Sequence, residues 1–176
     1  MAAGGYYIKV QSQGYIEVDS ANQGFIAGIN DATGGTRSTV MQYSAQQDTI
    51  KISSVNAPYT VTITKLPLSN PASAPKTFTG TGPQATDPVT LKKGTATIDV
   101  SCPDTAAGSD IQMFQVHLID GANGDELGVI ASNMKNGLVT NYHETVSFDV
   151  PADGEYILLL PLSTSPNAQW TMTVSQ

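Results

Sequence analysis

Residues 145–154 read TVSFDVPADG, and this stretch decides the fold class. Val146, Phe148 and Val150 alternate with polar residues, which is the pattern of a strand with one buried and one solvated face. Residues 151–154 then form a turn that begins with proline. The stretch therefore predicts a strand followed by a tight reversal, as in an antiparallel sheet.

The same alternation recurs through the second half of the chain. It is clear at residues 97–100 and 114–118, and two further strand-like runs follow at 156–160 and 170–174. Asn123-Gly124 is a strong signal for a short hairpin. No segment shows the 3.6-residue apolar period of a helix. These features predict an antiparallel β-sandwich.

The first half follows this pattern less regularly, and a proline-rich segment separates the halves. Strand-like runs are expected at residues 7–10, 15–18, 25–27, 39–41, 49–52 and 59–63. Pro67, Pro71 and Pro75 exclude a helix and predict an extended connector. We therefore expect a small all-β domain at residues 1–66, a linker at 67–76 and a larger β-sandwich domain at 77–176.

Composition and charge exclude several partners. The chain has 176 residues, of which 13% are charged, and its net charge is −7. Residues 1–67 hold four basic and four acidic residues, whereas residues 68–176 hold four Lys against eleven acids, so the acid excess lies in the second half. With one Arg and no basic stripe, we expect neither a nucleic-acid partner nor attraction to an anionic membrane.

The beginning of the sequence and its single cysteine set further expectations. Residues 1–7 lack the basic and apolar regions of a signal peptide, and no window approaches 18 uninterrupted apolar residues. We expect no secretion by a standard signal and no membrane insertion. Cys102 stands alone, so the fold needs no intrachain disulfide.

Motifs for catalysis are missing from the sequence. His117 and His143 are its two histidines, and neither belongs to an HxH or HExxH pattern. No Gly-x-Ser-x-Gly elbow or phosphate-binding glycine loop occurs. We therefore predict that the protein is not an enzyme and needs no cofactor, with calcium as the one ion to consider.

A cluster of oxygen-bearing side chains provides a candidate calcium site. Acidic residues are frequent between residues 99 and 126, and no Lys or Arg lies among them. Calcium binds hard oxygen ligands of this kind. The candidate ligands surround one turn and are Asp120, Asn123, Asp125 and Glu126. Asp104 and Asp110 occupy a second loop that would fold over it. The alternative is that Asp and Asn serve only to form the turns.

Tyrosines provide candidate contact residues for a partner or a glycan. Tyr6 and Tyr7 are adjacent, so in a strand one ring faces inward and the other outward. An outward ring near the beginning of the chain would offer a flat surface for a protein or for the apolar face of a sugar. Tyr142 is a third candidate. Ordinary packing is the alternative for all three.

The second half also resembles a known family. The segments that carry the resemblance are residues 78–82, 89–100, 114–120, 150–156 and 170–174. In this order they resemble the pre-peptidase C-terminal-type β-sandwich modules of bacterial surface and secreted proteins. The resemblance implies a jelly-roll-like, non-catalytic fold, and some such modules bind glycans or calcium. Members normally follow a signal peptide and an enzyme, neither of which is seen here, and residues 1–66 resemble no family.

Two classes of function follow from these observations. The first is a structural protein of a bacteriophage virion surface, such as a head-decoration or tail-associated protein, because virions assemble in the cytoplasm and need no export signal. Its partner would be a particle protein or another copy of this chain, joined at a sheet edge. The alternative is a secreted glycan-binding or adhesion module, stabilised by calcium and located outside the cell or on its surface.

Overall fold

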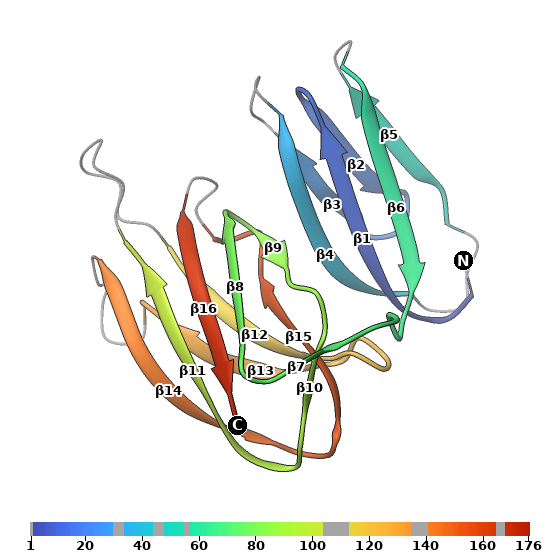
Figure 1. Ribbon diagram of the computed structural model, residues 1–176. Helices are drawn as coiled ribbons and strands as arrows, with labels where there is room; N and C mark the ends of the chain where they lie inside the picture. Colours follow the sequence, from blue (N-terminus) through green and yellow to red (C-terminus); the bar gives the residue numbers. More distant parts are fainter. Residues whose placement is uncertain are drawn as a thin grey trace.

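The computed structural model describes residues 2–29, 34–43, 48–54, 57–103, 113–134, 141–164 and 168–176. Strands are the only regular elements within these ranges, which confirms the all-β prediction. Figure 1 shows two sandwiches, one made of β1 to β6 and the other of β7 to β16. The division between them falls at the proline-rich segment.

The N-terminal sandwich has two sheets of three antiparallel strands each, in the orders β4-β1-β6 and β3-β2-β5. Its strands are β1 (Gly4–Ser12), β2 (Ile16–Ser20), β3 (Gly24–Ile29), β4 (Gly35–Tyr43), β5 (Ile50–Ser54) and β6 (Tyr59–Lys65). Alternate residues of β1 and β2, such as Ile8, Val10, Ile16 and Val18, fill the space between the sheets. Each strand predicted from the sequence is present.

The C-terminal sandwich is a jelly roll. Its eight main strands are β8 (Lys76–Thr81), β10 (Val89–Leu91), β11 (Gly94–Cys102), β12 (Gln115–Asp120), β13 (Glu126–Ser132), β14 (Tyr142–Val150), β15 (Gly154–Leu160) and β16 (Gln169–Ser175). They form two sheets in the orders β14-β11-β16-β8 and β13-β12-β15-β10. The chain crosses repeatedly between the sheets, which is the connectivity of a double Greek key.

Two short strands complete the second sheet. β7 (Ala72–Ser73) pairs in parallel with β10, and β9 (Gln84–Ala85) pairs with β15. Since β7 lies within residues 67–76, part of the expected linker is a strand of the jelly roll. A Pro cannot donate to a ladder, but the non-proline residues between Pro71 and Pro75 can pair.

The core of the jelly roll follows the alternation read from the sequence. Ile98 and Val100 from one sheet meet Leu118 and Leu158 from the other. Trp170 is also buried, and its indole nitrogen donates to the carbonyl oxygen of Gly82 at 3.0 Å. The core residues thus place the inner face of each sheet against that of the other.

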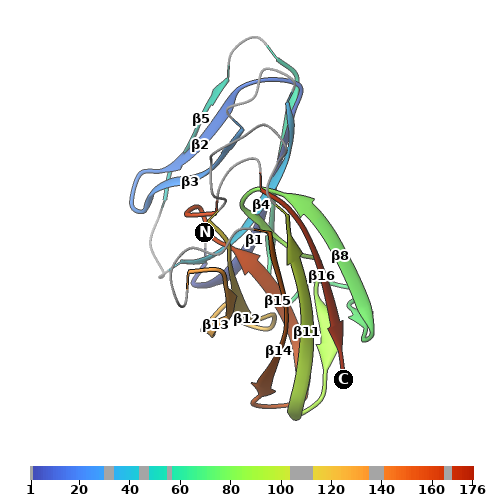
Figure 2. The ribbon, with the colours of Figure 1, turned by 90° about the vertical axis from the view of Figure 1, so that its left-hand side faces the viewer.

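A third apolar cluster joins the two sandwiches. It consists of Tyr7, Leu66, Ala85, Ile119 and Ile157, which are all buried. The outer face of the sheet β4-β1-β6 is therefore covered by the jelly roll around Tyr7 and Val40. Figure 2 shows β1 and β4 beside the end of the jelly roll near β12 and β15.

Candidate functional site

The predicted hairpin at Asn123-Gly124 is confirmed between β12 and β13, and its side chains build the turn itself. Asp120 accepts a hydrogen bond from the Ala122 amide at 2.8 Å, and the Asn123 side chain accepts one from the Asp125 amide at 2.7 Å. Gly124 has a φ of 85°, which favours glycine. These contacts are those of Asp and Asn as turn formers.

The carboxylates of the candidate calcium ligands Asp125 and Glu126 contact different residues. Asp125 accepts from the side chain of Gln42 at 2.7 Å, and Glu126 lies 2.7 Å from the Nδ1 atom of His117. Within the described residues, no group of three or more acidic, His or Cys side chains is placed to hold a metal ion. Asp104 and Asp110 lie outside the described residues. The calcium site stays a prediction.

The same turn docks the jelly roll onto the N-terminal sandwich. Gln42 donates to the carbonyl oxygen of Asn123 at 2.9 Å in addition to the Asp125 carboxylate. A Cβ atom at Gly5 would lie 2.1 Å from that carbonyl oxygen, so the backbones of β1 and the turn are in direct contact. No sequence pattern reveals this role, because Gly5 and Gln42 lie far from the turn along the chain.

The three candidate tyrosines are buried. Tyr6 packs edge-on against Tyr43 in the N-terminal core, with ring centroids 5.6 Å apart. Tyr7 faces the other way, as the alternation predicts, but the jelly roll covers it and its hydroxyl donates to Ala85. Tyr142 lies against Phe114 in the jelly-roll core. None of the three rings offers an outward platform.

The hydroxyl of Tyr142 is held in its phenol form. Burial and a hydrogen bond to Glu144, at 2.7 Å, both raise its pKa well above the ordinary value. A tyrosine in this state does not act as a base near neutral pH. The arrangement indicates a packing role for the ring.

The histidines lie apart on different sheets. His117 is on β12 and pairs with Glu126, whereas His143 is on β14 with its Nε2 atom 3.3 Å from Asp99. Each contact joins one imidazole to one carboxylate across neighbouring strands. The structure does not bring the two histidines into a common site.

One side of the N-terminal sandwich is open. On one side of the sandwich, β3 and β4 pack against each other. On the other side, the described residues of β5 and β6 make few contacts with each other. Ile63 pairs with the core residue Ile8, and Ile52 pairs with the core residue Val18, so both isoleucines point between the sheets. Each nevertheless remains 38% exposed.

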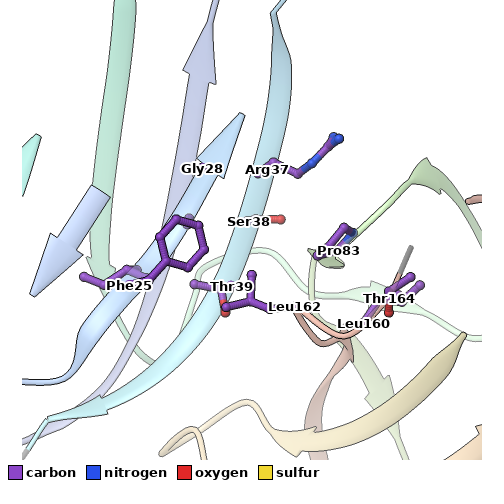
Figure 3. A pocket seen from close by; sticks show the side chains of 11 residues that line it. Phe25, Gly28, Arg37, Ser38, Thr39, Pro83, Leu160, Leu162 and Thr164 are labelled. Atoms are coloured by element: carbon purple, nitrogen blue, oxygen red, sulfur yellow. The ribbon is translucent and has the colours of Figure 1, made fainter. Parts of the chain in front are cut away.

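A cavity lies where the two sandwiches meet, opposite the open side. It has a volume of about 280 Å³ and is lined by residues of β3 and β4 together with Pro83, Leu160, Leu162 and Thr164 (Figure 3). Phe25 and Leu162 leave large apolar surfaces exposed there. From the sequence, Phe25 is predicted only to be part of a strand. Its position beside Leu162 could not be predicted, because the folded chain brings these two distant residues together.

Comparisons with known proteins provide no family for the chain. Neither protein-family models nor curated proteins gave a match. Among solved structures, the chain was aligned with infectious bursal disease virus of the Gx strain, at 10% identity and a TM-score of 0.22, over 98% of this chain and 57% of the other. The Gt strain gave 12% identity and the same TM-score, over 98% and 58%.

The chain thus spans less than two thirds of the length of either viral chain. A TM-score of 0.22 does not indicate a shared fold. The resemblance of residues 77–176 to pre-peptidase C-terminal-type modules stays a prediction. No helix able to cross a membrane occurs in the part of the chain that the structure describes.

Proposed function

We propose that this protein is a non-catalytic structural component of a bacteriophage virion surface, as a head-decoration or tail-associated protein, that acts through protein–protein contacts. The observation that carries the proposal is the open side of the N-terminal sandwich. There, β5 and β6 leave inward-facing isoleucines exposed, and each strand has one edge that pairs with no other strand among the described residues. Exposed apolar edges of this kind are pairing sites for another chain.

The partner that suits this edge is a strand from another copy of the chain or from a particle protein. An added strand beside β5 or β6 would supply main-chain hydrogen bonds, and its apolar residues would cover Ile52 and Ile63. The edge strand β6 also carries Thr60, Thr62 and Thr64 on the opposite face, which suits contact with water. The edge therefore has one face for a partner and one for solvent.

Sedimentation of the purified chain tests the proposal. We expect a symmetric oligomer, or a complex when the neighbouring virion proteins are added. Ile63→Lys places a charge between the sheets and should abolish the association, whereas Thr62→Lys alters the solvated face of the same strand and should leave it intact. Equal association of both variants, or a wild-type chain that stays monomeric with every virion protein, contradicts the proposal.

The second candidate is the secreted glycan-binding or adhesion module. The cavity between the sandwiches favours it, because an exposed aromatic ring lies beside hydroxyl groups there. Neighbouring genes discriminate between the two candidates. Capsid and tail genes support the virion component, whereas a hydrolase gene or a signal-bearing precursor supports the secreted module.

A further inference from the structure

The cavity between the sandwiches is built from both halves of the chain. The N-terminal sandwich contributes Phe25 and Thr39, and the jelly roll contributes Pro83, Leu162 and Thr164. In Figure 3 the Phe25 ring lies on the β3–β4 side and Thr164 on the jelly-roll side, with Leu162 between them. The site therefore exists only when the two halves are docked.

A β-bulge turns Phe25 toward this cavity. β2 and β3 pair Val18 with Ala27 but Asp19 with Phe25, so Ile26 is an extra residue in β3. In a regular strand, Phe25 and Ala27 would point to the same side because they are two residues apart, and Phe25 would face the core. With the bulge, Ile26 and Ala27 are both buried, and Phe25 is 44% exposed. Bulges commonly redirect a side chain in this way at functional sites.

Gly28 fixes the position of the Phe25 ring. A Cβ atom at Gly28 would lie 3.0 Å from two atoms of the ring, so the ring rests directly on the glycine backbone. The aromatic face is thus supported from behind and does not need a ligand to hold it. A preorganised ring of this kind loses little conformational entropy on binding.

The jelly-roll wall of the cavity carries an exposed apolar side chain and a buried hydroxyl group without a hydrogen-bond partner among the residues that the structure describes. Leu162 is 53% exposed at the cavity. Thr164 is only 2% exposed, yet its hydroxyl makes no hydrogen bond within the described part of the chain. A buried hydroxyl normally has a partner, because leaving it unpaired is unfavourable. The wall of the cavity thus combines exposed apolar surface with a buried hydroxyl that has no partner within the described residues.

We propose that this cavity binds one neutral pyranose ring at the end of a glycan. The Phe25 ring and Leu162 would contact the apolar face of the sugar, and Thr164 would exchange a hydrogen bond with one of its hydroxyls. Among the described residues no carboxylate lines the cavity, which disfavours a cation. The charged residue in its lining is Arg37, whose guanidinium donates to the carbonyl oxygen of Thr36 at 3.0 Å. Pockets for drug-sized ligands enclose about 300–1,000 Å³, so a volume of about 280 Å³ suits a ligand of one ring.

Saturation-transfer NMR tests the site in the full chain. The probes are methyl β-D-glucopyranoside, methyl β-D-galactopyranoside and methyl α-D-mannopyranoside, with mannitol as a polyol that lacks a ring. We expect at least one pyranoside to bind with a Kd on the order of 1 mM and mannitol to show no transfer. Absence of transfer to all three pyranosides, or equal transfer to mannitol, overturns the proposal.

Two variants locate the site. Phe25→Ala should weaken binding by roughly two- to tenfold, whereas Tyr59→Ala, which removes an equally exposed ring on β6, should not. Thr164→Val should weaken binding while raising the melting temperature, because it removes a buried hydroxyl that is unpaired without ligand. Wild-type affinity in Phe25→Ala or Thr164→Val overturns the assignment.

This inference does not depend on the proposed virion role. Sedimentation reports on the open edge at β5 and β6, and sugar binding reports on the cavity near β3 and β4. The two measurements use different variants, so the failure of one proposal leaves the other intact.

Discussion

Gly5 has room for a hydrogen atom only. Because a Cβ atom there would lie 2.1 Å from the Asn123 carbonyl oxygen, Gly5→Ala forces β1 and the hairpin turn apart. We expect a loss of about 1–3 kcal/mol in the free energy of unfolding, measured by chemical denaturation. Gly154→Ala is the control, since its nearest neighbour beyond the adjacent residues lies at 3.8 Å. Equal losses in both variants would disprove the steric explanation.

Asp153 provides a pH-dependent contribution to stability. The Lys93 amide donates to its carboxylate at 2.8 Å and the Lys92 side chain at 3.3 Å, and together these bonds lower its pKa below 3.8. A carboxylate whose pKa is lower in the folded state stabilises the fold above its unfolded pKa. We therefore expect Asp153→Asn to be less stable than wild type at neutral pH.

The difference should shrink and vanish as the pH falls below 3.8 and through the lower pKa of the folded state. Urea denaturation of both proteins at a series of pH values measures it. A stability difference that stays constant down to the lowest pH would show that the carboxylate charge is not its source.

At the scale of the elements, Ser38 on β4 connects the N-terminal sandwich to β9. Its hydroxyl donates to the Ala85 carbonyl at 2.7 Å and accepts from the Ala85 amide at 3.2 Å. Ser38→Ala leaves that buried amide without this acceptor, at a cost of about 1–3 kcal/mol. We expect faster hydrogen exchange at Ala85, while Thr62→Ala on the exposed face of β6 leaves it unchanged. Unaltered exchange in Ser38→Ala would contradict this role.

The strands themselves could be predicted, because their cause is local. Val146, Phe148 and Val150 alternate with polar residues, and Phe148 and Val150 are buried as expected. Asn123-Gly124 forms the predicted hairpin, since the left-handed backbone at the glycine is set within the turn.

The surroundings of individual side chains could not be predicted in the same way. Tyr7 faces away from the core of its own sandwich, as the alternation indicates, but another part of the chain covers it. Phe25 reaches the cavity through a bulge, which has no signature in residues 24–29. Asp125, a candidate calcium ligand, accepts a hydrogen bond from Gln42 of the other sandwich. Each outcome depends on residues distant in sequence.

At the scale of the whole molecule, the shared cluster around Ile119 couples the two sandwiches. Ile119 is buried between them together with Tyr7, Leu66 and Ile157. We expect the wild type to unfold in a single calorimetric transition. Ile119→Ala removes buried contacts worth about 2–5 kcal/mol and should separate the transition into two.

Ile98→Ala is the matched control, because Ile98 lies entirely within the jelly-roll core. It should lower the melting temperature without uncoupling the sandwiches. Two transitions in the wild type, or a split transition in both variants, would show that the shared cluster does not couple them.

The strand order also has a consequence for how the protein is made. β16, from residues 169–175, lies between β8 and β11, so that sheet stays divided until these residues leave the ribosome. The N-terminal sandwich uses no strand beyond Lys65 and is free to fold during translation. We therefore expect a newly made chain to form its first sandwich, with the Tyr7 face uncovered, while the second is still being synthesised.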